Sequence, residues 1–316
     1  MKTVVYTCSS WGIPLLLELS KKGMLQGVIL PIDAQEALPI ESFAKQQGIP
    51  FIYVKETELT STLMDWLTAI SPDLAYCITF PFLLPSQIIT LPRYGTVNFH
   101  FGKLSNNRGP DPLFWTLSEG SSTATITAHL MDQCFDNGPV INEINVPVFP
   151  GENWGLLGAR LSIKLLDLLS SIETKLVNGH ELQIEKHNDP KPRPQSDHIS
   201  IRWSEQSADS VESLVNACNP KYGGAVTLFR GSLVHILEVS PADVSNSTLM
   251  APGSIVYADN QNGIFVLCAD YRFLRINVIR TPEAYLTGFK LAALGVKTNE
   301  KFYSSLSSKE ESLIIH

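Results

Sequence analysis

The chain has 316 residues, 44% of them hydrophobic and 17% charged, a composition that is typical of folded globular proteins and excludes extensive disorder. The formal net charge of −7 argues against non-specific binding to a polyanion, although a local basic patch is compatible with an acidic total. The five cysteines include no C-x-x-C pair, so neither a zinc site nor a disulfide framework is indicated, and we expect no bound metal.

The first residues, MKTVVYTCSSWG, lack the long apolar segment of a signal peptide and are typical of a strand. No run of about eighteen apolar residues, the length that spans a membrane, occurs elsewhere. The scattered cysteines fit a reducing compartment. We therefore expect a cytoplasmic protein that is neither secreted nor inserted in a membrane.

The N-terminal third of the chain alternates between β-type and helical patterns. Short apolar runs predict strands, and stretches with apolar residues at helical spacing predict helices between them. This alternation is typical of a doubly wound, mostly parallel α/β sheet. In chain order, the expected strands are Thr3 to Thr7, Gly27 to Leu30, Phe51 to Val54, Leu74 to Thr79 and Gly95 to His100, and the expected helices are Ile13 to Lys22, Ile40 to Gln47 and Leu59 to Ile70.

Asn98 and His100 stand at the carboxyl end of the last of these strands. Residues at i and i+2 project from the same face of a strand, and open α/β sheets bind ligands at the carboxyl ends of their strands. A carboxamide beside an imidazole could stabilise an oxyanion and accept a proton from an amine, and Asp136 in a downstream turn could orient the imidazole. The same residues also fit a structural interpretation, in which they end a strand, bond a loop and form a turn.

The next segments extend the sheet. We expect a short helix from Pro112 to Glu119, strands from Thr123 to Met131 and from Pro139 to Val148, and a long helix from Asn153 to Val177. His129, in the alternating pattern of the first of these strands, is interpreted as a structural histidine.

A change in composition separates the two halves of the chain. The stretch HNDPKPRPQSD has three prolines and no large apolar residue, which predicts a linker. Beyond it we expect a helix from Ser207 to Cys218, capped by Ser207, and then short strands at regular spacing, which predict a small β-barrel. The expected domains are 1–186, a linker at 187–198, a barrel domain at 199–303 and a tail at 304–316.

Three motifs occur in order: Asn98-x-His100, the turn Arg108-Gly109, and Met131-Asp132-x-x-x-Asp136-x-Gly138. Together they resemble the formyltransferase family that uses 10-formyltetrahydrofolate. The second half resembles the small OB-like barrel that follows the catalytic domain in methionyl-tRNA formyltransferases. The resemblance implies a Rossmann-like catalytic domain and a barrel domain.

The resemblance also implies roles for individual residues. Asn98 and protonated His100 would stabilise the oxyanion that forms when an amine attacks the formyl carbon, and Asp136 would tune the imidazole. A donor aimed at such an oxyanion contributes roughly 3 kcal/mol. The folate is expected between two loops, at Phe80, Pro81, Phe82, Leu83, Leu84, Met131, Asp132, Cys134 and Phe135, and the acceptor at Ser9, Trp11, Gly102, Lys103 and Arg108.

Two departures from the family pattern concern the acceptor. Gly102 to Ser105 reads GKLS where many relatives have S-L-L-P, and the loop Pro31 to Pro39 lacks the basic residues expected of members that act on tRNA. From residue 199 onward, ten lysines and arginines face eleven acidic residues, so the second domain is not basic either. Cationic side chains supply most of the affinity for a nucleic acid.

We therefore expect an N-formyltransferase for a small or carrier-tethered primary amine, such as an amino acid derivative, a siderophore precursor or an amino sugar. Formylation of methionyl-tRNA is the main alternative. A hydrolase of the same folate, and a non-catalytic folate-binding protein, are further alternatives.

Overall fold

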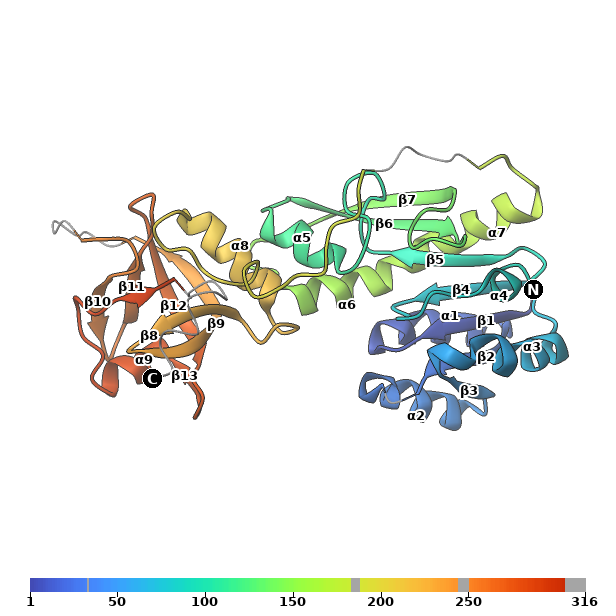
Figure 1. The fold of residues 1–316 in the computed structure, drawn as a ribbon, viewed down its shortest axis with the longest axis horizontal. Coiled ribbons are helices and arrows are strands. Elements are labelled where there is room, and N and C mark those ends of the chain that lie inside the picture. The colour runs from blue at the N-terminus through green and yellow to red at the C-terminus, as the bar shows by residue number, and fades with distance from the viewer. Residues whose placement is uncertain (33, 183–187, 244–249, 305–316) are drawn as a thin grey trace. The chain divides into compact units, whose positions relative to one another are not determined.

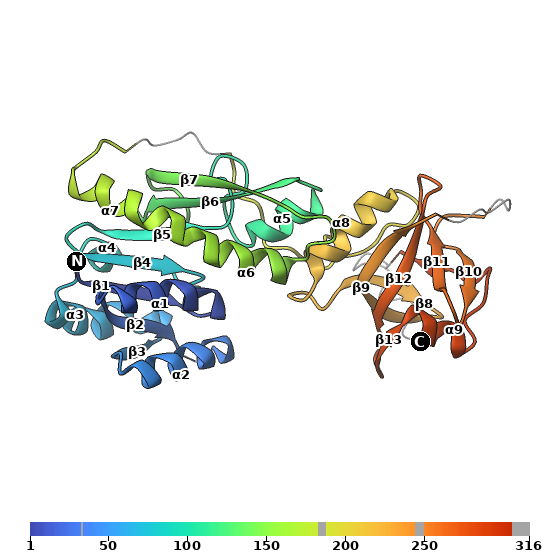
Figure 2. The same cartoon turned by 180° about the vertical axis from the view of Figure 1, so that it is seen from behind.

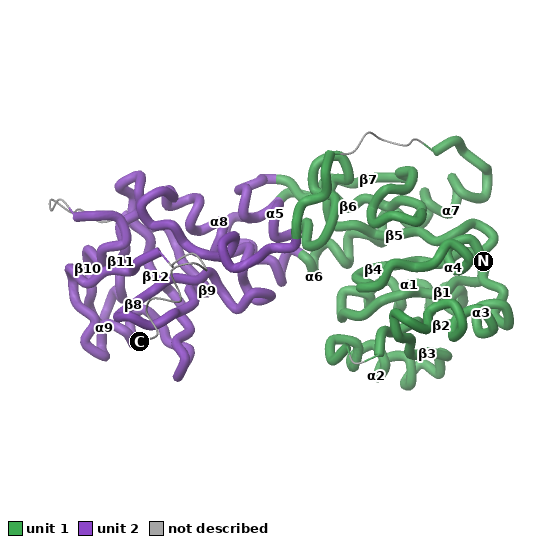
Figure 3. The backbone as a smooth tube through the Cα atoms, viewed as in Figure 1, with its two compact units in different colours: residues 1–112, 123–147, 158–192 green, residues 113–122, 148–157, 193–316 purple. Residues whose placement is uncertain are grey.

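The computed structural model describes residues 1–32, 34–182, 188–243 and 250–304. These form two compact units, which Figure 3 distinguishes by colour. The first comprises Met1–Pro112, Thr123–Pro147 and Gly158–Pro192; the second comprises Leu113–Ser122, Val148–Leu157 and the described residues from Arg193 onward. The first residue of the predicted linker, His187, and the predicted tail after residue 304 lie outside the described residues.

The first unit contains a seven-stranded sheet in the order β3-β2-β1-β4-β5-β6-β7. The strands β3, β2, β1, β4 and β5 are parallel, whereas β6 pairs antiparallel with β5 and β7 antiparallel with β6. The prediction of a doubly wound, mostly parallel sheet is confirmed. The strands are β1 (Thr3–Thr7), β2 (Leu25–Pro31), β3 (Phe51–Val54), β4 (Leu74–Ile78), β5 (Thr96–His100), β6 (Thr123–Leu130) and β7 (Val140–Pro147).

Helices cover both faces of this sheet (Figures 1 and 2). On one face, α3 (Leu59–Ile70) and α4 (Ser86–Ile89) pack onto buried residues of β1 and β4. On the other lie α1 (Ile13–Lys21) and α7 (Leu169–Val177), with the part of α6 (Trp154–Lys164) that belongs to this unit. The helix α2 (Leu38–Gln47) follows β2 in the chain and ends at Gln47, as predicted.

The prediction of a single long helix from Asn153 to Val177 is wrong in one respect. A 3-10 turn, η4 (Leu165–Leu168), divides it into α6 and α7. Side chains at i and i+3 lie over one another in a 3-10 helix, so the turn directs both Leu165 and Leu168 into the core, where both are buried.

The carboxyl ends of the parallel strands lie along one side of the sheet. The topological switch point is on this side. The chain runs outward from β1 through β2 to β3 and then returns to place β4 on the other side of β1. Ligands of open α/β sheets bind at such a point. The carboxyl ends of β1, β4 and β5, at Thr7, Ile78 and His100, therefore lie side by side.

The second unit is built on an antiparallel sheet in the order β10-β11-β12-β9-β8-β14, with β13 paired to β12. Backbone hydrogen bonds join residues 253–255 to residues 299–302, so the sheet curls back on itself. This arrangement confirms the predicted small barrel. The strands are β8 (Ala225–Phe229), β9 (Ser232–Ala242), β10 (Ile255–Asp259), β11 (Gly263–Leu267), β12 (Phe273–Arg280), β13 (Tyr285–Thr287) and β14 (Phe302–Tyr303).

Trp203 and Phe302 form the centre of this unit. Both are almost fully buried, and the Trp203 indole donates to Thr227 Oγ1 at 2.9 Å. The unit also contains most of α5 (Pro112–Ser118), together with α8 (Ala208–Cys218) and α9 (Gly288–Ala293). Among the described residues, no helix is long and apolar enough to cross a bilayer.

Replacing Ser207 by alanine should destabilise the second unit by about 1 kcal/mol, because Ser207 Oγ accepts the backbone N–H of Ser210 at the start of α8. Ser207→Asp keeps an acceptor oxygen at this position and should remain near wild-type stability. Urea unfolding followed by the fluorescence of Trp203, with the other tryptophans replaced, measures the difference. An alanine variant as stable as the wild type would contradict this role for Ser207.

Candidate active site

Asn98 and His100 lie at the carboxyl end of β5, as the sequence predicts. The neighbouring strand β6 is antiparallel, and its register sets His129 directly opposite Asn98. Directly opposed residues on paired strands place their side chains on the same face. Accordingly, the Asn98 amide nitrogen lies 3.1 Å from Nε2 of His129.

The Asp136 carboxylate joins these side chains from the turn after β6. Its backbone has φ of 50°, a left-handed conformation that aspartate tolerates better than most residues. Oδ1 accepts a hydrogen from Asn98 Nδ2 at 3.1 Å, and Oδ2 accepts the backbone N–H of Gly109 at 3.3 Å. Oδ1 also lies 3.4 Å from Nδ1 of His100 and 3.6 Å from Nε2 of His129.

His100 is buried, and both of its ring nitrogens face oxygen atoms of the protein. Nε2 lies 2.7 Å from the carbonyl of Asn107, opposite the nitrogen that faces Asp136. A carbonyl and a carboxylate only accept hydrogen bonds, so an imidazolium, which donates from both nitrogens, satisfies the site. Burial lowers the pKa of His100, but the attraction and hydrogen bond of the Asp136 carboxylate outweigh it, and the net pKa is raised.

The same pairing acts in the opposite direction on the carboxylate. Burial alone would raise the pKa of Asp136, but the charge and the hydrogen bond of the nearby His100 imidazolium hold it well below its usual range. Both shifts favour an ionised Asp136 carboxylate beside a protonated His100 imidazole. The site contains a buried ion pair on which Asn98 converges.

The sequence did not reveal that His129 takes part in this network. Its Nδ1 faces the carbonyl of Leu130 at 2.9 Å and so carries a hydrogen, which leaves Nε2 to accept the hydrogen from Asn98. The alternating pattern does assign His129 to a strand. No sequence motif indicates the register between β5 and β6, and it is this register that brings His129 to Asn98.

The residues predicted to bind folate lie beside this network. Phe80, Phe82, Leu84 and Met131 share one apolar cluster with buried residues of β4. The backbone N–H of Met131 donates to Thr96 of β5, while Phe135, next to Asp136, is 55% exposed. Asp132 accepts hydrogen bonds from the backbone N–H of Cys134 and from the Asn137 side chain. Pro81 and Cys134 are exposed, and Leu83 is half-buried.

The structure does not bring two of the predicted acceptor residues into the network of Asn98, His100, His129 and Asp136. The Ser9 hydroxyl instead lies 2.9 Å from that of Thr79. The Trp11 indole packs on Phe101 and covers Gly158, where a Cβ would overlap its ring. Lys103 is exposed in the loop after β5.

Arg108 lies close to the network. Its Nη1 donates to Asn137 Oδ1 at 3.0 Å, next to Asp136 in the chain. Its Nε is buried without a hydrogen-bond partner, and the described residues provide no carboxylate that forms an ion pair with it. A cation without a counter-ion at this position can bind an anionic group of a ligand.

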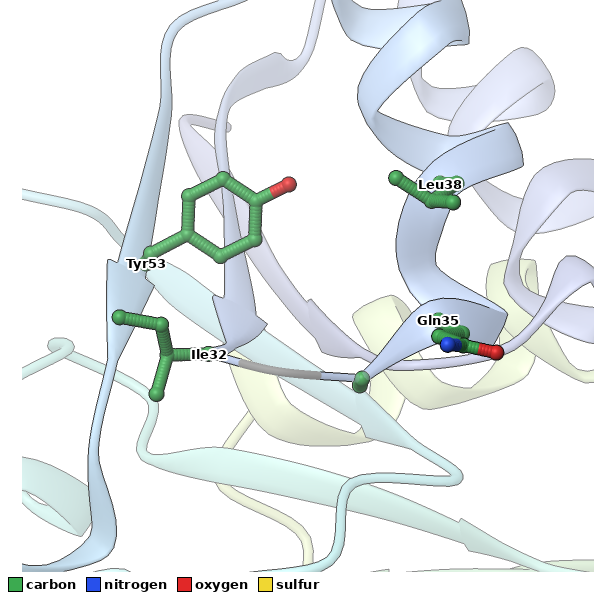
Figure 4. Close-up of a pocket in the computed structure, with 5 residues that line it drawn as sticks. Ile32, Gln35, Leu38 and Tyr53 are labelled. Carbon is green, nitrogen blue, oxygen red and sulfur yellow. The ribbon is translucent and has the colours of Figure 1, made fainter.

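A separate hollow lies at the carboxyl ends of β2 and β3 (Figure 4). Ile32, Leu38 and the ring of Tyr53 line it, with Ala34 and Gln35. The Tyr53 hydroxyl donates to Glu41 at 2.7 Å, which fixes the ring. The walls are of mixed polarity and carry no charged side chain among the described residues, and Leu38 is 56% exposed.

Comparison with known proteins identifies the family. The model described as "Formyl transferase" matches residues 8–169, just over half of the chain, and "Formyl transferase, C-terminal domain" matches residues 195–286. The chain belongs to the formyl transferase family. The predicted enzyme class is thus confirmed, as is the donor, since the family uses 10-formyltetrahydrofolate.

Several curated relatives of this formyltransferase are methionyl-tRNA formyltransferases. That of Geotalea uraniireducens is 27% identical over 73% of this chain and 72% of its own length. That of Geotalea daltonii is 28% identical over 83% and 84%. Each match is long enough to extend over both halves of this chain.

Solved structures share the fold at low identity. HypX from Aquifex aeolicus, solved with tetrahydrofolic acid, has a TM-score of 0.65 at 14% identity and covers 97% of this chain. The formyltransferase spans about half of HypX. The sugar 3N-formyl transferase WlaRD, solved with dTDP and 5-N-formyl-THF, has a TM-score of 0.61 at 11% identity, over 87% of this chain and 96% of its own.

The ion pair predicts a definite pH dependence. His100 should titrate above its ordinary value of 6.5, and Asp136→Asn, which leaves burial dominant, should bring the midpoint below 6.5. Because the folded-state pKa of His100 is raised, its pairing stabilises the fold fully below pH 6.5, and this stabilisation is lost as the pH rises through the folded-state value. Imidazole NMR titration measures the midpoint.

Asp132→Asn is the matched control for this titration. It removes a carboxylate that bonds Asn137 rather than His100, so the His100 midpoint should not move. A wild-type midpoint at or below 6.5 would show that the Asp136 carboxylate does not outweigh burial.

We expect His100 to act in the reaction, so Gly102→Ala should reduce formyl transfer by about 100-fold, the effect that a small displacement of a reacting group has. A Cβ at Gly102 would lie 3.0 Å from His100 Nε2 and 2.9 Å from the Asn107 carbonyl, and would push the two apart. Steady-state kinetics with any accepted amine measures the loss. Asn106→Ala, at an exposed position in the same loop, is the control and should keep its activity.

Proposed function

We propose that Asn98, His100 and Asp136 are the catalytic residues of an N-formyltransferase, with His129 positioning Asn98. The observation that carries the proposal is the ion pair between His100 and Asp136, onto which the Asn98 amide is directed. Such a site holds a protonated donor beside a carboxamide in a largely buried position. These are the groups needed to stabilise a developing oxyanion and to transfer a proton.

The residues beside the network fit a folate. Phe80, Phe82 and Met131 offer an apolar and aromatic surface, which suits a flat ring system. Arg108, with its buried and unpartnered Nε, is suited to an anionic group. When bound, 10-formyltetrahydrofolate supplies the formyl group that the acceptor amine attacks.

The protein's part in the reaction follows from its hydrogen bonds. Asn98 donates to Asp136 and to His129, and His100 donates to Asp136 and to the Asn107 carbonyl. Donation to the formyl oxygen thus requires one of these internal contacts to be exchanged for the substrate. The Asn107 carbonyl is the simplest to exchange, because Asp136 continues to hold the imidazolium. Asp136 then stabilises His100 while its proton is shared with the oxyanion.

For the acceptor, we propose the amino group of a methionyl-tRNA. The support is that several relatives are methionyl-tRNA formyltransferases, and that the similarity to one of them extends over 83% of this chain and 84% of its own length. This favours the alternative over the small amine preferred from the sequence alone.

A small or carrier-tethered amine is the second candidate, on a specific observation. The loop after β2 contains no lysine or arginine, and its described residues line an uncharged hollow with Tyr53 rather than a cationic surface. Asp33 of this loop lies outside the described residues. A loop of this kind offers nothing to a phosphate backbone.

The acceptor is decided by comparing charged initiator tRNA with a panel of free amines, including methionine amide and amino sugars, at a fixed donor concentration. We expect kcat/KM for the tRNA to exceed that of each free amine by about 100-fold, and its logarithm to fall linearly with the logarithm of salt concentration, as for phosphate contacts. Formylation of a small amine alone, without a salt dependence, would overturn the tRNA proposal. Formate release without any acceptor would indicate a hydrolase.

The catalytic roles are tested on whichever acceptor is used. Asn98→Ala and His100→Ala should each lower kcat by about 100-fold to 1000-fold, the usual effect of losing an oxyanion donor. His129→Gln keeps an acceptor for the Asn98 amide and should lower kcat less than His129→Ala. Full turnover by a folded Asn98→Ala variant would contradict the assignment.

A further inference from the structure

Thr79 immediately follows β4, at the switch point of the sheet, and has φ of 54°. Threonine is branched at Cβ, and the left-handed region is unfavourable for such residues. Conformations of this kind persist where surrounding contacts hold them, and they concentrate at functional sites. The residues that hold Thr79 therefore indicate what its conformation serves.

The end of β1 supplies those contacts from consecutive residues. The Thr79 hydroxyl donates to the carbonyl of Ile78 at 2.7 Å, so its oxygen is left to accept. Ser9 Oγ, at 2.9 Å, is then the donor to Thr79 Oγ1. The Cys8 thiol donates to the Thr79 carbonyl, and Thr7 Oγ1 lies 3.5 Å from Thr79 Oγ1.

The conformation of Thr79 decides where the following residues go. Phe80 comes next and packs edge-on against Tyr6 of β1, with ring centroids 5.4 Å apart. Phe82 packs edge-on against Phe80, also at 5.4 Å. Both rings lie in the apolar cluster that includes Met131. With an extended Thr79 the chain would leave β4 in another direction.

We propose that Ser9 and Cys8 act as a clamp on Thr79, and that the clamp positions the loop Phe80–Leu84 as one wall of the folate site. Ser9 is on this account a positioning residue for the donor, and not a contact of the acceptor as the sequence resemblance implies. The proposal rests on the proposed donor site for its consequence in catalysis. The clamp itself rests only on the contacts of Thr79.

The test compares Ser9→Ala with Ser10→Ala, its exposed neighbour, as the matched control. In Ser9→Ala, amide hydrogen exchange in the peptide covering residues 80–84 should become about 10-fold faster, because the local opening is no longer held. The KM for 10-formyltetrahydrofolate should rise about 5-fold or more while kcat stays within about twofold, the pattern of lost binding rather than lost chemistry. Ser10→Ala should change neither quantity.

A rescue experiment separates the clamp from a general loss of structure. Glycine adopts a positive φ without help, so Ser9→Ala/Thr79→Gly should restore the slow exchange of residues 80–84 and the low donor KM. Ser9→Ala/Thr79→Ala removes the same side chain, but alanine is strained at this φ and should not restore them. Equal behaviour of the two double variants would overturn the proposal.

Hydrogen exchange of residues 80–84 and the KM for the donor together distinguish failure of the clamp from failure of the proposed folate site. Exchange that is unchanged in Ser9→Ala overturns the clamp, whatever the kinetics show. Faster exchange, rescued by Thr79→Gly, with a donor KM that does not move in any variant, supports the clamp and overturns the placement of folate against Phe80–Leu84.

Discussion

The buried carboxylate of Asp136 is the constraint on which the rest of the site depends. An ionised carboxylate is stable away from water only when charge and hydrogen bonds replace its hydration. Here β5 supplies Asn98 and His100, β6 supplies His129, and the loop after β5 supplies the backbone N–H of Gly109. One carboxylate thus binds three segments of the chain together at the carboxyl end of β5.

Much of this arrangement could be predicted from the sequence, for physical reasons that differ between elements. Alternating strands and helices follow from local periodicity, and Asn98 with His100 share a face because side chains in a strand repeat every two residues. His129 and Ser9 could not be placed in this way. Their neighbours are set by the pairing of β5 with β6 and of β1 with β4, and strand register depends on contacts distant in sequence.

The donor and the acceptor side of the enzyme differ in how firmly they follow the family pattern. The network around Asp136 and the apolar cluster with Phe80 contain the residues that we propose for formyl transfer and for the folate. The loop after β2 lacks the basic residues expected of relatives that act on tRNA, and the stretch from Gly102 to Ser105 departs from the sequence of many relatives. Chemistry demands fixed groups at fixed distances, whereas recognition of a large acceptor can be spread over many weak contacts and so tolerates such changes.

The hydrogen bonds between residues 253–255 and 299–302 have a consequence beyond the fold of the second unit. A sheet with two open edges exposes rows of unpaired N–H and C=O groups, on which another chain can add a strand. Here the start of β10 bonds to the segment that leads into β14, so the two ends of the sheet satisfy each other. At these residues the backbone groups are already paired, so a strand of another chain cannot add to the sheet there.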